Sequence, residues 1–207
     1  MRTRSAIFAA ALAIGAGVSL TTSLASRAET PQSPLNFTAD GKLQFPKDYR
    51  TWIYLSTGLD MSYSERTGDV SQHVFDNVFV NPAAYAAFQR TGAWPDKTIF
   101  VLEVRRGVSR GSINKAGVYQ TEVASVEAHV KDTARFKSGW AFFPLDRAGP
   151  VQALPQTSGC NVCHEQHAAV DTTFVQFYPS LLPKAQEMKT LSAKYLAEEE
   201  ASKDQAR

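Results

Sequence analysis

Cysteine, histidine and methionine are scarce in this 207-residue sequence, which contains two, four and three of them respectively. Two cysteines are too few for the multiple disulfides that stabilise small secreted folds. Neither sign of charge is in excess: 20% of the residues are charged and the formal net charge is +2. The basic residues are scattered and form no stripe interleaved with aromatic side chains, which argues against nucleic acid as a partner. The composition, 43% hydrophobic, is that of a globular protein with one sizeable core.

The sequence also lacks an apolar run of the ~20 residues that a membrane-spanning helix needs. Its most apolar stretch, residues 6–20, is rich in alanine and glycine and follows Arg2 and Arg4. With small residues up to Ala28, this pattern predicts a secretory signal peptide over residues 1–28, with cleavage after Ala25 and a retained membrane anchor as the alternatives. Removing three arginines with this segment would leave the mature chain slightly negative.

The remaining chain contains no internal repeat and no long linker, so we expect one domain. Hydrophobic patterns predict an α+β fold, a mostly antiparallel β-sheet with a short helix after the second strand and a C-terminal helix. The strands are expected within residues 43–55, 73–80, 98–106, 118–130 and 139–145.

Two helices are predicted from clear local signals. Asn81 as N-cap, Pro82 at the first helical position and Gly92 as a stop predict the short helix. From residue 181 onward the apolar residues fall on one face of a single predicted helix, more suited to core packing than to binding a cofactor. These residues are Leu181, Ala185, Met188, Leu191 and Tyr195.

Both cysteines lie in one motif, Cys160-Asn161-Val162-Cys163-His164. The spacing C-x-x-C-H is typical of c-type haem attachment. Each thiol adds to one vinyl group of the haem, and the adjoining histidine is carried beneath the ring toward the iron. The motif therefore predicts one covalent haem c bound to Cys160 and Cys163, with His164 as the iron ligand.

Two other readings of this motif are weaker. A disulfide or thioredoxin-like redox pair suits an exported protein, but such pairs usually lie near a βαβ unit, whereas this motif follows a run of strands. A zinc site formed by Cys160, Cys163, His164 and His167 would lack the loop that separates ligand pairs in structural zinc sites.

The sixth iron position decides the function, because electron carriers close it with methionine or histidine and gas-binding or catalytic haems leave it open. His167 is too close to His164 in sequence to reach the other side of the same haem, and Met61 is in a polar loop that leaves its role open. The candidates are Met61, Met188, His73, His129 and His167.

Several segments, in order along the chain, are similar to the cytochrome P-460 family, which includes the β-sheet cytochromes c′. They are residues 45–52 (FPKDYRTW), 73–82, 92–96 (GAWPD) and 135–143, followed by the haem motif, Asp171 and residues 174–179 (FVQFYP). The resemblance implies a haem domain over residues 45–180, preceded by a polar segment 29–44 and followed by a C-terminal helix and tail, 181–207. It also implies a β-rich, often dimeric protein with one five-coordinate haem, in the periplasm.

In family members with an unusual spectrum, a lysine bonds to the porphyrin edge and the site oxidises hydroxylamine or nitric oxide. The resemblance places that lysine in the strand after the Trp-Pro-Asp turn, where this sequence has no lysine and Leu102 lies near the expected position. Lys97 and Lys115 are the nearest substitutes, although both are expected to be solvated turn or loop residues.

Three functions remain open. The first is binding of nitric oxide or a similar small nitrogen ligand at an open haem. The second is a hydroxylamine or nitric oxide oxidoreductase with a lysine–haem cross-link, in which an acid such as Glu103 or Glu122 accepts protons; the catalytic residues are unknown. The third is electron transfer to a redox partner protein, with Met61 closing the site.

Overall fold

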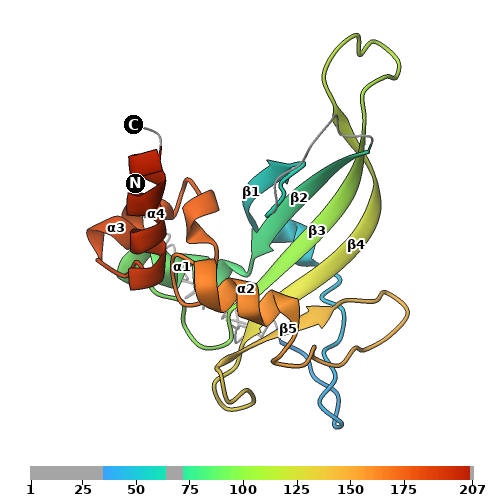
Figure 1. The fold of residues 1–207 in the computed structure, drawn as a ribbon. Helices are drawn as coiled ribbons and strands as arrows, with labels where there is room; N and C mark the ends of the chain where they lie inside the picture. The colour runs from blue at the N-terminus through green and yellow to red at the C-terminus, as the bar shows by residue number, and fades with distance from the viewer. Residues whose placement is uncertain (1–34, 64–71, 206–207) are drawn as a thin grey trace, which may run out of the picture. The chain divides into compact units, whose positions relative to one another are not determined.

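The computed structural model describes residues 35–63 and 72–205, so the predicted signal peptide lies outside the described residues. Its centre is a five-stranded antiparallel sheet with the strands in sequence order, which confirms the predicted α+β class (Figure 1). The strands are β1 (Ile53–Leu59), β2 (His73–Val80), β3 (Ile99–Val108), β4 (Tyr119–Lys131) and β5 (Trp140–Pro144). No helix in the described residues is long and apolar enough to cross a membrane.

The first helix, α1 (Pro82–Thr91), starts and stops where its signals predicted. Gly92 ends it in the left-handed conformation, with φ of 67°, which glycine adopts without penalty. Asn81 does not cap the helix through its side chain. Its Oδ1 instead accepts a hydrogen bond from the Ile99 N–H at 2.9 Å, so it ties the helix start to β3.

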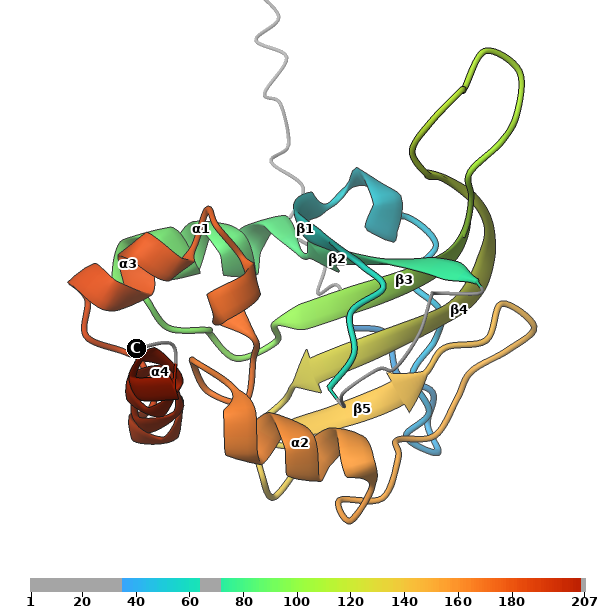
Figure 2. The same cartoon turned by 45° about the horizontal axis from the view of Figure 1, so that its top comes forward.

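The C-terminal region forms two helices, α3 (Leu182–Glu187) and α4 (Ala193–Gln205), so the prediction of one continuous helix was wrong. The chain breaks between them, where Lys189 adopts a φ of 56°. Leu181, Ala185 and Tyr195 still enter the core, whereas the Met188 side chain is largely exposed. Figure 1 and Figure 2 both show α3 beside α1, and the two helices are in contact.

The sheet has two covered faces, because alternate residues of a strand point to opposite sides. The face that we call the helical face packs Val80, Phe100 and Trp140 against residues of α1, α3 and α4. The opposite face packs against the N-terminal segment, including the short 3-10 helix η1 (Tyr49–Thr51). Two further segments, α2 (Gly159–His167) and the 3-10 helix η2 (Val175–Phe177), follow β5, and α2 contacts both β5 and α4 (Figure 2).

Candidate functional site

Helix α2 carries the C-x-x-C-H motif. Its first turn is anchored by Asn161, which is buried and donates hydrogen bonds to the Pro155 carbonyl at 3.0 Å and the Ser158 hydroxyl at 3.1 Å. Cys160 and Cys163 are three positions apart, a spacing that puts both on one side of a helix. Both are free thiols and only partly buried. The helix therefore presents two free thiols along one side.

His164 is held by one hydrogen bond. Its Nδ1 donates to the carbonyl oxygen of Thr172 at 2.7 Å, because a carbonyl can only accept. The proton is therefore on Nδ1, and Nε2 keeps its lone pair for a metal. A histidine that binds a metal through one nitrogen usually donates from the other in this way.

The His164 ring lies among aromatic side chains. The ring centroids of Phe174, Phe142 and His129 are 4.0, 4.7 and 5.1 Å away. Burial lowers the pKa of His164, and the hydrogen bond to Thr172 offsets this only in part. The imidazole is therefore neutral at pH 7, which is the form that coordinates iron.

The two thiols do not have the character of a redox pair. Burial raises the pKa of Cys160, and the charge of Glu127 raises it further. Burial and the charge of Glu198 raise the pKa of Cys163 in the same way. Redox C-x-x-C motifs instead depend on a thiolate whose pKa is depressed. The disulfide-exchange reading is therefore disfavoured by the environment of both sulfurs.

The zinc reading fails on geometry. His167 points to α4, where its Nδ1 lies 2.5 Å from Glu198 Oε1. In residues 35–63 and 72–205, no group of three or more histidine, cysteine, aspartate or glutamate side chains is placed to hold a metal ion. The four proposed zinc ligands are not brought together.

The helical face of the sheet carries two acids that sequence reasoning missed, Asp76 on β2 and Glu127 on β4. Leu102 pairs with Val78 on one side and with Glu127 on the other, and Asp76 is two residues from Val78. Because cross-strand partners share a face and Val78 packs with the helices, all of these residues lie on the helical face. In the sequence, the feature that could have revealed each of these two acids was its position among the apolar residues of a predicted strand.

The carboxyl groups of Asp76 and Glu127 both have raised pKa values. Burial raises the pKa of Asp76, with a further contribution from the charge of Asp60. Burial also raises the pKa of Glu127, to which the charge of Asp76 adds. Neither carboxylate makes a hydrogen bond or ion pair within the described part of the chain. Since Glu127 also acts on the Cys160 thiol, this carboxylate lies near the haem motif.

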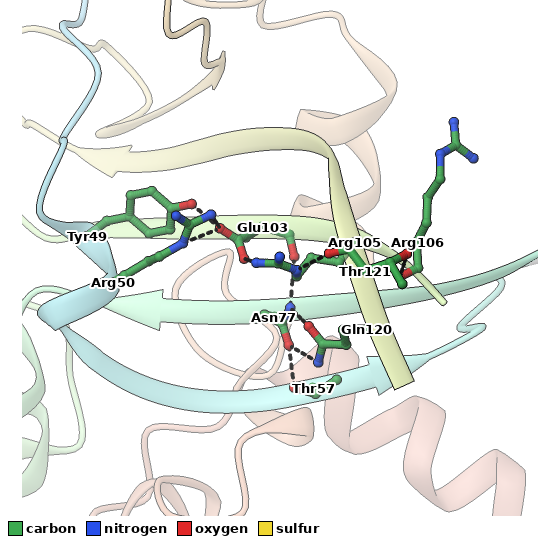
Figure 3. Close-up of polar contacts among 9 residues, drawn as sticks. All are labelled: Tyr49, Arg50, Thr57, Asn77, Glu103, Arg105, Arg106, Gln120 and Thr121. Carbon is green, nitrogen blue, oxygen red and sulfur yellow. Dashed lines mark hydrogen bonds and ion pairs between the residues drawn. The ribbon is translucent and has the colours of Figure 1, made fainter. Parts of the chain in front are cut away.

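The two acids predicted as proton acceptors lie elsewhere. Glu103 is 2% exposed on the opposite face, where Tyr49, Arg50 and Arg105 all donate to its carboxylate (Figure 3). Arg50 Nε and Arg105 Nη1 each lie 2.8 Å from it. Glu122 is exposed and paired with Arg106 at 3.3 Å. Neither is placed to accept a proton at the site, so both predictions are corrected.

Three of the five candidate sixth ligands point away. Besides His167, these are His73, whose Nδ1 lies 2.6 Å from Asp60, and Met188, which is exposed beside Gly92. His129 is buried on the helical face, but its ring is in direct contact with that of His164, with no space for a porphyrin between them. These four residues are therefore not placed to bind iron on the side opposite His164.

Met61 also lies on the helical face. A Cβ atom at Gly58 would overlap the Met61 sulfur, so the thioether covers that glycine. Gly58 pairs with Asp76, which shows the face on which it lies. Met61 therefore stays a candidate ligand.

The nearest lysines are not on the helical face near Leu102. Lys97 lies in the turn before β3 and pairs with Asp132 at 2.5 Å. Lys115 is exposed in the loop between β3 and β4. Strand β3 itself contains no lysine, and Leu102 lies near the position where the resemblance leads us to expect one.

Comparison with known proteins identifies the family. A family model described as Cytochrome P460 matches residues 46–175, which include the whole sheet, α2 and His164. A search of curated proteins finds no match. The matched region covers more than half of the chain and contains the haem motif, so the chain belongs to the cytochrome P460 family of haem proteins.

Proposed function

We propose that the protein is an exported, periplasmic c-type cytochrome whose single haem binds nitric oxide or a similar small nitrogen ligand. Cys160 and Cys163 hold the haem covalently and His164 binds its iron through Nε2. The residues fit this group, because α2 offers two free thiols and a neutral imidazole with an uncommitted nitrogen. When bound, the haem supplies an iron with one coordination position left for a ligand.

We choose a small uncharged ligand because of one residue, Leu102. It lies on the helical face between Val78 and Glu127, near the position where a cross-linking lysine is expected. An aliphatic side chain neither bonds to the porphyrin edge nor ligates iron. An open site that presents this aliphatic side chain favours a small uncharged ligand, which needs no ionic partner for its binding.

A second function is favoured by Asp76 and Glu127. Oxidation of hydroxylamine releases protons, and a carboxylate with a raised pKa is suited to accept them. In this alternative the haem would supply the redox centre for oxidation of hydroxylamine or nitric oxide without a lysine cross-link, and a redox partner protein would accept the electrons. Electron transfer is the third function, and it requires Met61 to close the site.

Absorption spectra of the haem-loaded protein with and without nitric oxide separate these functions. We expect a high-spin spectrum that shifts on addition of nitric oxide, in the wild type and equally in Met61→Leu. A low-spin spectrum that becomes high-spin in Met61→Leu would instead establish a closed electron carrier. Turnover of hydroxylamine that is lost in Glu127→Gln, with unchanged nitric oxide binding, would establish the enzyme.

A further inference from the structure

A small cavity lies beside the His164 ring. Its walls include His129, Trp140 and Thr172. The volume that the centres of water molecules can occupy is about 30 Å³. One water molecule needs roughly 10–15 Å³ measured in this way. The cavity therefore has room for about two or three waters.

Three buried polar atoms have no hydrogen-bonding partner within the part of the protein that the structure describes. They are His129 Nε2, Trp140 Nε1 and Thr172 Oγ1, and all three residues line this one cavity. His129 is 7% and Trp140 3% exposed, so bulk solvent does not satisfy them. Buried polar groups of this kind are normally paired with protein or with ordered water.

We propose that this cavity is a water-binding site whose water supports the turn that orients His164. The water accepts a hydrogen bond from Trp140 Nε1, which can only donate, and donates one to His129 Nε2. The Thr172 hydroxyl, which can donate or accept, provides the third partner. Three partners is the usual number for a buried water.

Thr172 connects the cavity to the haem motif. Its hydroxyl is one of the three unpaired atoms, and its carbonyl accepts the hydrogen bond from His164 Nδ1. Asp171 and Thr172 have φ values of 45° and 60°, a left-handed backbone that residues other than glycine rarely adopt. A turn in this conformation needs support from its surroundings. Thr172, His129 and Trp140 are thus positioning residues for His164.

A crystal structure of the haem-loaded protein tests the site directly. We expect a water within hydrogen-bonding distance of at least two of the three atoms. A haem carboxylate at these atoms, or a rearrangement that pairs them with protein groups, would overturn the proposal. The inference rests on the proposed role of His164, and the same structure shows separately whether His164 binds iron.

Two variants at Thr172 test the positioning role. Thr172→Val keeps the shape and the branched Cβ but removes the hydroxyl, whereas Thr172→Ser keeps the hydroxyl. Without the water, the carbonyl shifts and the Nδ1 hydrogen bond weakens, so His164 becomes a poorer electron donor to iron. We expect Thr172→Val to lower the iron–histidine stretching frequency of the ferrous protein and to raise its reduction potential, with Thr172→Ser near wild type.

Ser138→Ala is the matched control, because Ser138 lines the same cavity but its hydroxyl already donates to the Trp140 carbonyl at 2.8 Å. It should leave the iron–histidine frequency unchanged. If Thr172→Val does not fold, Trp140→Phe removes one partner of the water and should shift the frequency in the same direction. Equal frequencies in Thr172→Val and Thr172→Ser, or in Trp140→Phe and wild type, would refute the positioning role.

Discussion

At the scale of single residues, the pKa values of carboxyl groups are shifted in opposite directions on the two faces of the sheet. Glu103 is buried among three donors, whereas Asp76 and Glu127 are partly buried and have no hydrogen-bond or ion-pair partner among the described residues. The difference follows from the strand register, since Glu103 and Leu102 are neighbours that face opposite ways. The environment rather than the residue type therefore decides which acid can exchange protons near the haem motif.

Asp76→Asn should stabilise the protein at neutral and alkaline pH. Burial raises the pKa of Asp76 in the folded state, so its charged form opposes folding as the pH rises through that value. The gain in the free energy of unfolding should be below about 1 kcal/mol, because solvent screens a partly exposed group. It should vanish below the unfolded pKa, near 3.8. Urea unfolding between pH 3 and pH 8 measures this, and a gain independent of pH would contradict it.

Glu103→Gln should have the opposite effect. Burial alone would raise the pKa of Glu103, but hydrogen bonds from Tyr49, Arg105 and Arg50 outweigh it and hold the pKa below its usual 4.5. The ionised form therefore stabilises the fold above that pH, and this stability is lost as the pH falls through the folded pKa. We expect a loss of about 2 kcal/mol at pH 7, which is typical of hydrogen bonds to a charged group.

The matched control for Glu103→Gln is Glu122→Gln. Glu122 is exposed and paired with Arg106, and exposed pairs contribute little to stability. Thermal unfolding of both variants at pH 7 and pH 4 should show a pH-dependent loss for Glu103→Gln and no change for Glu122→Gln. Similar losses in the two variants would show that the buried network has no special role.

At the scale of the elements, what could be predicted depended on how local the signals were. Strand β2 and helix α1 match their predictions because a cluster of β-branched and aromatic residues, Pro82 and Gly92 all act within a few residues. The break between α3 and α4 was missed, since the apolar spacing runs on past the left-handed Lys189. The haem motif could be read from five residues, whereas Asp76 and Glu127 required the register of three strands.

The end of α1 is packed tightly against the end of α3. A Cβ atom at Gly92 would meet the Met188 side chain at 2.6 Å, and the Thr190 hydroxyl donates to the Gly92 carbonyl at 2.7 Å. Gly92→Ala should therefore cost both the left-handed backbone penalty of about 1–2 kcal/mol and an overlap penalty of about 1–3 kcal/mol. Chemical denaturation measures the sum.

Gly117→Ala separates the two penalties. Gly117 also has a positive φ, of 82°, but nothing lies within 4 Å of its added Cβ. This variant should lose only the backbone penalty. If Gly92→Ala and Gly117→Ala are equally destabilised, then the contact between the ends of α1 and α3 does not restrict this position.

At the scale of the whole molecule, the predicted export signal and the proposed covalent cofactor belong together. The sequence predicts that residues 1–28 are removed, and the proposed haem is attached in the periplasm, where the thiols of Cys160 and Cys163 meet it. The helices after the matched family region still contribute Leu181, Ala185 and Tyr195 to the core. The chain from the N-terminal segment to α4 therefore encloses the sheet that positions the haem motif.

The most direct test is the intact mass of the denatured protein, purified from cells that export it and make c-type haem. We predict the mass of residues 29–207 plus one haem, with the haem lost on denaturation only when Cys160 and Cys163 are both replaced by alanine. A wild-type chain that carries no haem after denaturation would contradict the central claim.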